Sequence, residues 1–399
     1  MGKDPDSRLE QQVTSGNGST SAADPTAEAA IPSGPAVHVE EQRGARLVAI
    51  KVLHFVAALF LFVLAIQLMK EGAGAIGPRL QASGLFDNAY QSLGLGWLGA
   101  YLVLSGSPIA ATALTFHHAG AITPLQTFAM LSGSRLGASF IVLLVGFLYA
   151  VRSQNRRESL GMGVLALSMT AIVYVPGMLL GYGILRSGLI SGVNWTAGEE
   201  LNGAIDVGWG WIMNLATGTV PAPLLFPIGL GVILVSFKLL DRVLPSLDGE
   251  KHAGSRAHWL KKPWPMFFLG SLAALLTLSV SVALTVLVPL ASKGYIKREQ
   301  AIPYIAGANI TTLADTLVAA MLLGTASGVQ VVLAEAIAVA LITVLFLAFA
   351  YRWLQRGIMG LDEWVVGSTV RLWLFVGILF VVPVALIAIG RLVGPPVGA

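Results

Sequence analysis

Long apolar stretches alternate with short polar connections along most of this chain. A helix that crosses a bilayer needs about 20 consecutive, mainly apolar residues. Residues 1–45 lack such stretches and are rich in Ser, Gly, Pro, Ala, Asp and Glu, which predicts a disordered tail. Beyond it, we expect membrane helices over residues 47–69, 93–116, 124–151, 160–185, 221–240, 265–291, 301–323, 331–351 and 370–392. The pattern therefore predicts an all-α polytopic membrane protein.

Two of the apolar segments contain polar breaks. Segment 93–116 includes Ser105-Gly106-Ser107-Pro108, which a plain spanning helix does not need. Proline is tolerated in the first turn of a helix, and a serine just before it can cap the free N–H groups. We therefore expect a half-helix to begin at Ser107-Pro108, at membrane depth, with Ser107 as its cap. Segment 265–291 carries a weaker break of the same kind, Ser279-Val280-Ser281.

Charges in the polar connections predict how the chain is oriented. Lys and Arg accumulate in cytoplasmic loops. Basic residues gather in 152–157, in 238–262 and at Arg352 and Arg356, whereas loop 188–206 contains none. Arg and Lys residues at the start of the first span place the N-terminus in the cytoplasm. These assignments agree only if segments 93–116 and 265–291 return to the side they entered, so both are expected to be re-entrant hairpins.

An internal repeat relates the two hairpins. Shifting the chain by 174 positions superposes Gly96 on Gly270, Ser105 on Ser279, Ser107 on Ser281, Gln126 on Gln300 and Gly133 on Gly307. Because the two copies enter from opposite sides, the pattern predicts inverted-topology repeats, as in many secondary transporters. The expected organisation is a tail (1–45), a first repeat (46–187), an external loop with an interfacial segment (188–220), a second repeat (221–361) and a C-terminal transmembrane helix with its tail (362–399).

Composition narrows the function. The chain of 399 residues is 55% hydrophobic and only 12% charged, with a mean hydropathy of +0.75, against roughly 25% charged residues in soluble domains. It has no cysteine, hence no disulfide and no thiolate chemistry. We find no basic patch interleaved with aromatics that would bind nucleic acid, and no ATP-binding or hydrolase motif. We expect no catalytic residues and a transport process driven by an ion gradient.

The breaks supply the candidate anion site. Helix N-termini carry unpaired N–H groups and the positive end of the helix dipole, which favour an oxyanion. The candidate ligands are Ser105, Gly106, Ser107, Ser279 and Ser281. The alternative is that these serines pack between helices or bond to their own backbone.

Arg135 is a further candidate anion ligand. It lies 11 residues into its segment, which is about 16 Å at 1.5 Å per residue. A charge at that depth is costly and marks a functional site by default. Guanidinium matches phosphate through two parallel hydrogen bonds. Alternatively, Arg135 pairs with Asp315 or Glu335, or replaces a lost sodium ion; Glu335 itself is expected near the outer end of its segment, exposed or interfacial.

Candidate coupling residues follow in the second copy. Asn309, Thr311 and Thr312 offer oxygen ligands to a hard cation such as Na⁺, and Asp315 follows Thr311 at i+4, on the same helix face. A sodium ion is therefore expected at Asn309, Thr312 and Asp315. Asp315 could instead carry a proton or pair with Arg135. Gln126 and Gln300 each precede a spanning segment, and we expect them to cap helix starts.

The motifs indicate a family. Each copy runs from a serine-containing break through Gly-x-Ile to a glycine-centred motif, which in the second copy is Gly307-Ala308-Asn309-Ile310-Thr311-Thr312. This arrangement resembles the type II sodium/phosphate cotransporters and their bacterial members, in which two inverted copies of Gln-Ser-Ser-Ser each precede Gly-Ala-Asn-Ile-Gly-Thr-Thr. Here Leu104 and Leu278 occupy the Gln positions, and Arg135 stands where the first copy of that family has Asn.

The resemblance implies sodium-coupled symport of inorganic phosphate or a related small oxyanion, at the repeat interface of a multi-pass cell-membrane protein. It implies no cofactor beyond the coupling ion, Na⁺ or else H⁺. The oligomeric state is open. Two alternatives remain: a proton-coupled transporter of a different anion, and a receptor or scaffold derived from the family that no longer transports.

Overall fold

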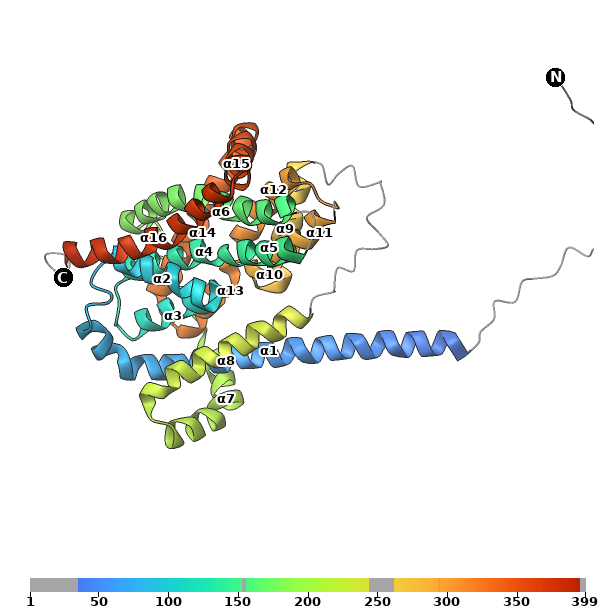
Figure 1. The fold of residues 1–399 in the computed structure, drawn as a ribbon. Coiled ribbons are helices and arrows are strands. Elements are labelled where there is room, and N and C mark those ends of the chain that lie inside the picture. Colours follow the sequence, from blue (N-terminus) through green and yellow to red (C-terminus); the bar gives the residue numbers. More distant parts are fainter. Residues whose placement is uncertain (1–34, 153–155, 244–261, 294, 395–399) are drawn as a thin grey trace, which may run out of the picture. The chain divides into compact units, whose positions relative to one another are not determined.

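A computed structural model describes residues 35–152, 156–243, 262–293 and 295–394 (Figure 1). Residues 1–48 and 49–399 form two compact units. Most of the predicted tail and of the second basic loop lies outside the described residues. The first helix, α1, begins at Pro35, within the predicted tail, because residues 35–45 include good helix formers such as Ala, Glu, Gln and Arg.

The described residues are helical and contain no strand. The helices are α1 (Pro35–Ala82), α2 (Ala89–Val103), α3 (Ser107–His118), α4 (Pro124–Ala138), α5 (Phe140–Arg152), α6 (Arg156–Ser187), α7 (Glu199–Thr219), α8 (Ala222–Val243), α9 (Pro263–Thr277), α10 (Val280–Thr285), α11 (Leu287–Ser292), α12 (Arg298–Thr311), α13 (Leu313–Leu323), α14 (Ala326–Leu345), the π-helical turn η2 (Phe346–Ala350), α15 (Tyr351–Val366) and α16 (Thr369–Val393).

Seven helical stretches of the described chain are long and apolar enough to cross a membrane. They are Ala49–Ala82, Pro124–Val151, Arg156–Ser187, Ala222–Asp241, Arg298–Leu323, Ala326–Val366 and Thr369–Val393. This confirms the prediction of an all-α polytopic membrane protein. The predicted segments 93–116 and 265–291 are instead divided into shorter helices, α2 and α3 in the first and α9, α10 and α11 in the second.

Both helix breaks occur at a leucine in the left-handed conformation. Leu104 ends α2 with φ 56°, and Leu278 ends α9 with φ 48°; they are the non-glycine residues with positive φ in the described chain. This conformation is costly for an L-residue other than glycine, yet it is a common way to stop a helix. The two leucines are 174 positions apart, as the predicted repeat requires.

The caps of the half-helices differ from expectation in the first copy. Ser107 is the first residue of α3 and not its cap; Gly106 holds the cap position and makes no side-chain cap bond. The backbone turns one residue earlier than predicted, because Leu104 ends α2 and Pro108 already lies inside the new helix. In the second copy Ser279 is the cap, and its Oγ accepts a hydrogen bond from the Val282 N–H at 3.3 Å.

Glycines bring α2 against α4 and α9 against α12. A Cβ on Gly96 would lie 2.1 Å from the Met130 carbonyl oxygen, and one on Gly270 would lie 2.0 Å from that of Tyr304. Gly133 and Gly307 are equally tight against α2 and α9. Small residues allow this approach of helix backbones within a membrane. Residues 174 positions apart thus occupy matching places in the packing, which supports the predicted repeat; the inverted orientation of its copies stays a prediction.

Two predicted loops are helical. Arg352 and Arg356 lie on α15, which continues α14 through η2. This helix forms because its apolar residues recur on one face, where Leu354, Ile358 and Val365 are buried. The predicted interfacial segment before residue 220 belongs to α7, which begins at Glu199.

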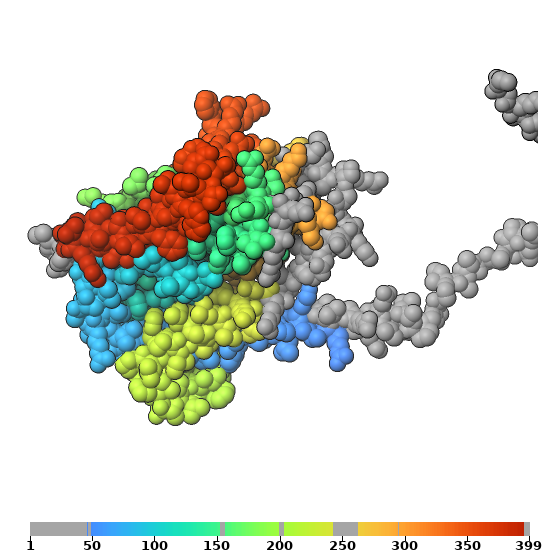
Figure 2. All heavy atoms as spheres, in the orientation of Figure 1, coloured from blue at the N-terminus to red at the C-terminus, as the bar shows by residue number. Residues whose placement is uncertain are grey.

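The C-terminal helix α16 lies on the surface of the second unit, drawn in red in Figure 2. It packs against α2, where the Asn88 Nδ2 donates to the Gly390 carbonyl at 2.6 Å and the Tyr101 hydroxyl donates to the Leu379 carbonyl at 3.1 Å. Many of its other side chains are exposed and apolar, including Trp373, Val381 and Leu392. A helix with such a surface is suited to contact with lipid.

Candidate functional site

The two helix breaks contact each other. The Ser281 hydroxyl of the second break donates a hydrogen bond to the carbonyl of Leu104 in the first, at 3.3 Å. This carbonyl is free to accept because it follows the last turn of α2, where carbonyls lack intrahelical partners. The structure therefore brings together two of the predicted anion-site segments, although they are far apart in sequence.

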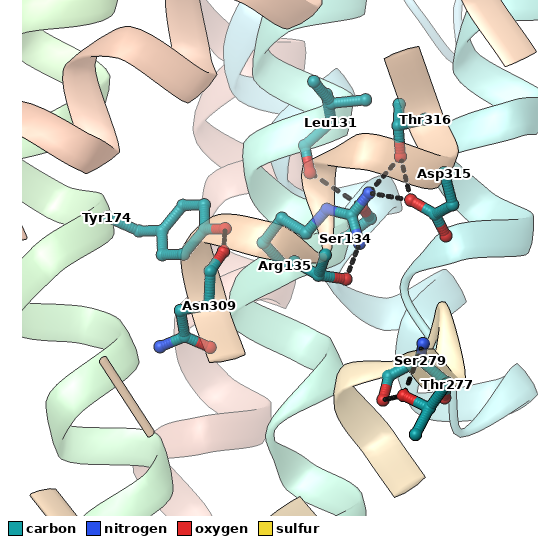
Figure 3. Close-up of polar contacts among 10 residues, drawn as sticks. Leu131, Ser134, Arg135, Tyr174, Thr277, Ser279, Asn309, Asp315 and Thr316 are labelled. Carbon is teal, nitrogen blue, oxygen red and sulfur yellow. Dashed lines mark hydrogen bonds and ion pairs between the residues drawn. The ribbon is translucent and has the colours of Figure 1, made fainter. Parts of the chain in front are cut away.

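The second break has its own polar support. The Thr277 hydroxyl donates to the Ser279 carbonyl at 2.8 Å and accepts from the Ser279 N–H at 3.1 Å (Figure 3). Since the Ser279 hydroxyl also caps α10, this serine is committed to the local backbone in the present conformation. Thr277 was not among the residues predicted from the sequence; the feature that could have indicated it is a hydroxyl directly before the break, where the first copy has Val103.

Arg135 is buried on the last turn of α4, with 3% of its surface exposed, and it is held by α13. Its Nη1 donates to the Thr312 hydroxyl at 3.0 Å and its Nη2 to the Thr316 hydroxyl. Nη2 also lies 3.7 Å from the Asp315 Oδ1. In Figure 3 the guanidinium points toward Thr316 and Asp315. Of the two carboxylates considered from sequence, Asp315 is therefore the ion-pair partner.

The position of Asp315 explains this choice. It lies in the first turn of α13, where the helix dipole favours a negative charge and opposes a positive one. Asp315 thus offsets the cost of placing a guanidinium at this helix N-terminus, and it also accepts a hydrogen bond from the Thr316 hydroxyl at 2.9 Å. Ser107, the first residue of α3, lies near the same carboxyl, which places the first break beside the Arg135–Asp315 pair.

Two other candidate coupling residues, Asn309 and Thr311, bond to helices other than α4. The Asn309 Nδ2 donates to the Thr170 hydroxyl at 3.0 Å, and the Asn309 carbonyl accepts from the Tyr174 hydroxyl at 2.9 Å, both on α6. The Thr311 hydroxyl donates to the Ser271 carbonyl of α9 at 2.9 Å. Thr311 thus bonds to α9, whereas Asp315 pairs with Arg135; α12 ends at Thr311 and α13 begins at Leu313.

Glu335 is buried, contrary to the expectation of an exposed or interfacial side chain. Only 1% of its surface is exposed. The physical reason is that α14 begins at Ala326, five residues before the predicted start, which moves Glu335 toward the middle of the helix. Ser132 and Arg135 of α4 and Tyr174 of α6 interact with it. Its signal in the sequence was a carboxylate within an apolar segment.

The two matched glutamines cap helices, as predicted. The Thr123 N–H donates to the Gln126 Oε1 at 2.7 Å, and the Lys297 N–H donates to the Gln300 Oε1 at 2.9 Å. Both interactions satisfy a backbone donor that the helix start would otherwise leave free. These amides are therefore part of the scaffold of α4 and α12.

Residues 232–381 match the family model described as Na+/Pi-cotransporter. The matched segment runs from within α8 to within α16 and contains the second break, Asp315 and Glu335, whereas Arg135 precedes it. No curated protein and no solved structure matches the chain.

The family match confirms the resemblance seen in the motifs. Proteins of this family are transporters and not enzymes, with a general role in sodium-coupled phosphate transport. The segment that carries the match also supplies the residues that hold Arg135. This match over residues 232–381 supports membership of the Na⁺/Pi-cotransporter family.

Proposed function

We propose that this protein is a secondary active transporter in which Na⁺ drives symport of inorganic phosphate or a related small oxyanion. The anion would bind where the two breaks meet, between Ser105–Ser107 and Ser279–Ser281, with Arg135 as its charged ligand. The observation that carries this proposal is the buried Arg135 guanidinium, whose carboxylate partner Asp315 lies near Ser107 of the first break.

The site is closed in the present conformation. Arg135 is occupied by Thr312, Asp315 and Thr316, and the pair is almost completely removed from solvent. An entering phosphate would compete with Asp315 for the guanidinium, because phosphate accepts two parallel hydrogen bonds from arginine. The N-terminal N–H groups of α3 would supply further donors to the anion.

This competition offers a physical basis for coupling. If the anion takes Arg135, Asp315 is left as an unpaired buried carboxylate, which costs several kcal/mol. A sodium ion at Asp315 and Thr312 would offset that cost, since Na⁺ prefers carboxylate and hydroxyl oxygens. Anion and cation would then enter together more favourably than either alone. Asn309, one helical segment earlier, would complete the cation site only after turning away from Thr170.

Uptake into proteoliposomes tests the proposal. Purified protein should accumulate labelled phosphate when an inward Na⁺ gradient is imposed, and much less when choline replaces Na⁺. Arg135→Gln should abolish the accumulation, whereas Arg352→Gln on α15 should leave it intact. Absence of phosphate uptake under any ion gradient would overturn the proposal.

Two alternatives have observations in their favour. A proton-coupled transporter of a different anion is favoured by Leu104, Leu278 and Arg135, which differ from the residues of the resembled family. Uptake that does not depend on Na⁺ but depends on a pH gradient would support this alternative. The closed pair of Arg135 and Asp315 favours a receptor or scaffold that does not transport. In that case neither phosphate nor Na⁺ should change the thermal stability of the purified protein.

A further inference from the structure

Glu335 is a buried carboxylate that has no hydrogen-bond partner among the residues described by the structure. It lies near the middle of α14, and 1% of its surface is exposed. Neither Oε1 nor Oε2 accepts a hydrogen bond from any described residue. Buried polar groups are nearly always paired, and an isolated buried carboxylate is especially costly. A bare negative charge on Glu335 is therefore not a stable arrangement in this conformation.

The charges around Glu335 also argue against a bare negative charge on this residue. Arg135 on α4 and Tyr174 on α6 interact electrostatically with Glu335, and both also interact with Asp315 on α13. Arg135 is the one cation among them, and Asp315 already pairs with it at 3.7 Å. The Tyr174 hydroxyl is directed to the Asn309 carbonyl. If both carboxylates were ionised, one negative charge would have no counter-ion.

The polar residues around Arg135 include further atoms without hydrogen-bond partners. The Ser132 Oγ, one turn before Arg135 on α4, lacks a hydrogen-bond partner among the described residues, as do the Arg135 Nε and the Asp315 Oδ2. Ser132 nevertheless lies close enough to act on the Glu335 carboxyl. A carboxylate beside an unpaired hydroxyl offers oxygen ligands to a small cation, and a carboxyl can equally hold a proton.

We propose that Glu335 binds a monovalent cation, either a proton or Na⁺, while Arg135 is paired with Asp315. This site is separate from the sodium site expected at Asn309, Thr312 and Asp315. When the cation leaves, the Glu335 carboxylate is left with an unneutralised negative charge and competes with Asp315 for the single guanidinium. The charge state of Glu335 thereby controls which carboxylate holds Arg135, and so how readily Arg135 accepts an anion. This role deepens the proposed transport function and rests on it for its physiological meaning.

Infrared difference spectroscopy on the purified full-length protein in lipid nanodiscs tests the site directly. Raising the pH at constant ionic strength should remove the carbonyl band of a protonated carboxyl if the cation is a proton. Exchanging choline for Na⁺ at fixed pH should alter the carboxylate bands if the cation is Na⁺. Either change should be absent in Glu335→Gln. It should persist in Asp362→Asn, a matched control that alters the buried carboxylate paired with Arg298 at 2.5 Å.

The proposal fails if the spectral change persists in Glu335→Gln, or if the wild-type protein responds to neither pH nor Na⁺. Glu335→Asp guards against a folding artefact, since it keeps the carboxylate and should restore the response with an altered midpoint. The spectra do not depend on phosphate uptake. A wild-type protein that gives the Glu335 signal but transports no phosphate would overturn the proposed function alone, whereas uptake without the signal would overturn the Glu335 site alone.

Discussion

At the residue scale, the Arg135 guanidinium interacts with two buried carboxylates, Asp315 and Glu335. Arg135 is paired with Asp315, which lies on the same helical turn as its two hydroxyl partners, Thr312 and Thr316. Glu335 is on another helix and lacks such support. The preference for Asp315 therefore follows from the helix start it occupies, where a carboxylate is stabilised and a lone guanidinium is not.

Removing the Asp315 carboxylate should show whether Glu335 can replace it as the partner of Arg135. Asp315→Asn leaves Arg135 without its partner, but Glu335 can move to take part of the charge, so we expect a loss of about 2 kcal/mol in the free energy of unfolding. Adding Glu335→Gln removes the last nearby carboxylate, and the combined loss should reach about 3–5 kcal/mol, the cost of an uncompensated buried charge. Unfolding of the purified protein by denaturant in mixed micelles measures both.

The control for this pair is Glu158→Gln. Glu158 also contacts an arginine, Arg298, at 3.1 Å, but 37% of its side chain is exposed. An exposed pair contributes only about 0–1 kcal/mol. Equal losses for Glu158→Gln and Asp315→Asn would contradict a structural ion pair at Arg135.

At the element scale, the breaks depend on two leucines in a conformation that suits glycine. Leu104 has φ 56° and 36% of its surface exposed, so its side chain contributes little packing. The strained conformation occurs where α2 ends. Because the helix ends there, the Leu104 carbonyl is free to accept a hydrogen bond from Ser281.

Leu104→Gly should therefore stabilise the protein by about 0.5–1.5 kcal/mol, because glycine adopts the left-handed region without steric cost. Leu102→Gly is the matched comparison: Leu102 is 87% exposed and lies in the last turn of α2. There glycine should destabilise by about 0.5–1 kcal/mol, since the residue is helical. Thermal unfolding of the two variants shows whether each substitution raises or lowers stability. A loss of stability in Leu104→Gly would argue against strain at the break.

The glycine contacts between helices carry a second prediction at this scale. Gly96→Ala and Gly270→Ala should each destabilise by about 1–3 kcal/mol, because a methyl group must push apart two helix backbones. Gly357→Ala on α15 is the control, since its added Cβ meets nothing within 4 Å. That variant should be neutral or slightly stabilised. Similar effects at Gly270 and Gly357 would mean that α9 and α12 are not in close contact.

At the scale of the whole molecule, the lengths of the half-helices bear on topology. The helices on either side of the first break, α2 and α3, have 15 and 12 residues, which correspond to about 22 Å and 18 Å at 1.5 Å per residue. Neither reaches across a hydrocarbon core of about 30 Å. Short helices joined by a polar break support the proposed re-entrant path, in which buried irregular backbone is tolerated.

Single cysteines can test that path, because the chain contains none of its own. Ser83→Cys and Leu125→Cys flank the first hairpin, and Lys262→Cys and Tyr295→Cys flank the second; all four positions are exposed. A membrane-impermeant maleimide should label the first two in intact cells and the last two only after permeabilisation. If the cysteines flanking one hairpin react from opposite sides, that hairpin spans the membrane and the repeats are not inverted as proposed.

The sequence alone determined the membrane helices, the positions of both breaks and the two glutamine caps. These features depend on local chemistry: continuous apolar length, hydroxyls and proline within an apolar run, and side chains that bond to their own helix start. The 174-residue correspondence was also visible because glycines and serines recur in one register. Among these local features, the cap of α3 was wrong by one residue: Gly106 occupies the cap position, and Ser107 is the first residue of the helix.

Only the tertiary structure decided how the polar residues are grouped. It paired Arg135 with Asp315, turned Thr311 toward α9 and Asn309 toward α6, and buried Glu335. Each outcome depends on which helix lies opposite, and sequence spacing carries no information on contacts between distant segments. The physical reason is the low polarity of the interior: every buried charge there requires a counter-charge, a hydrogen bond or a bound cation, and the helix packing determines which of these each charge obtains.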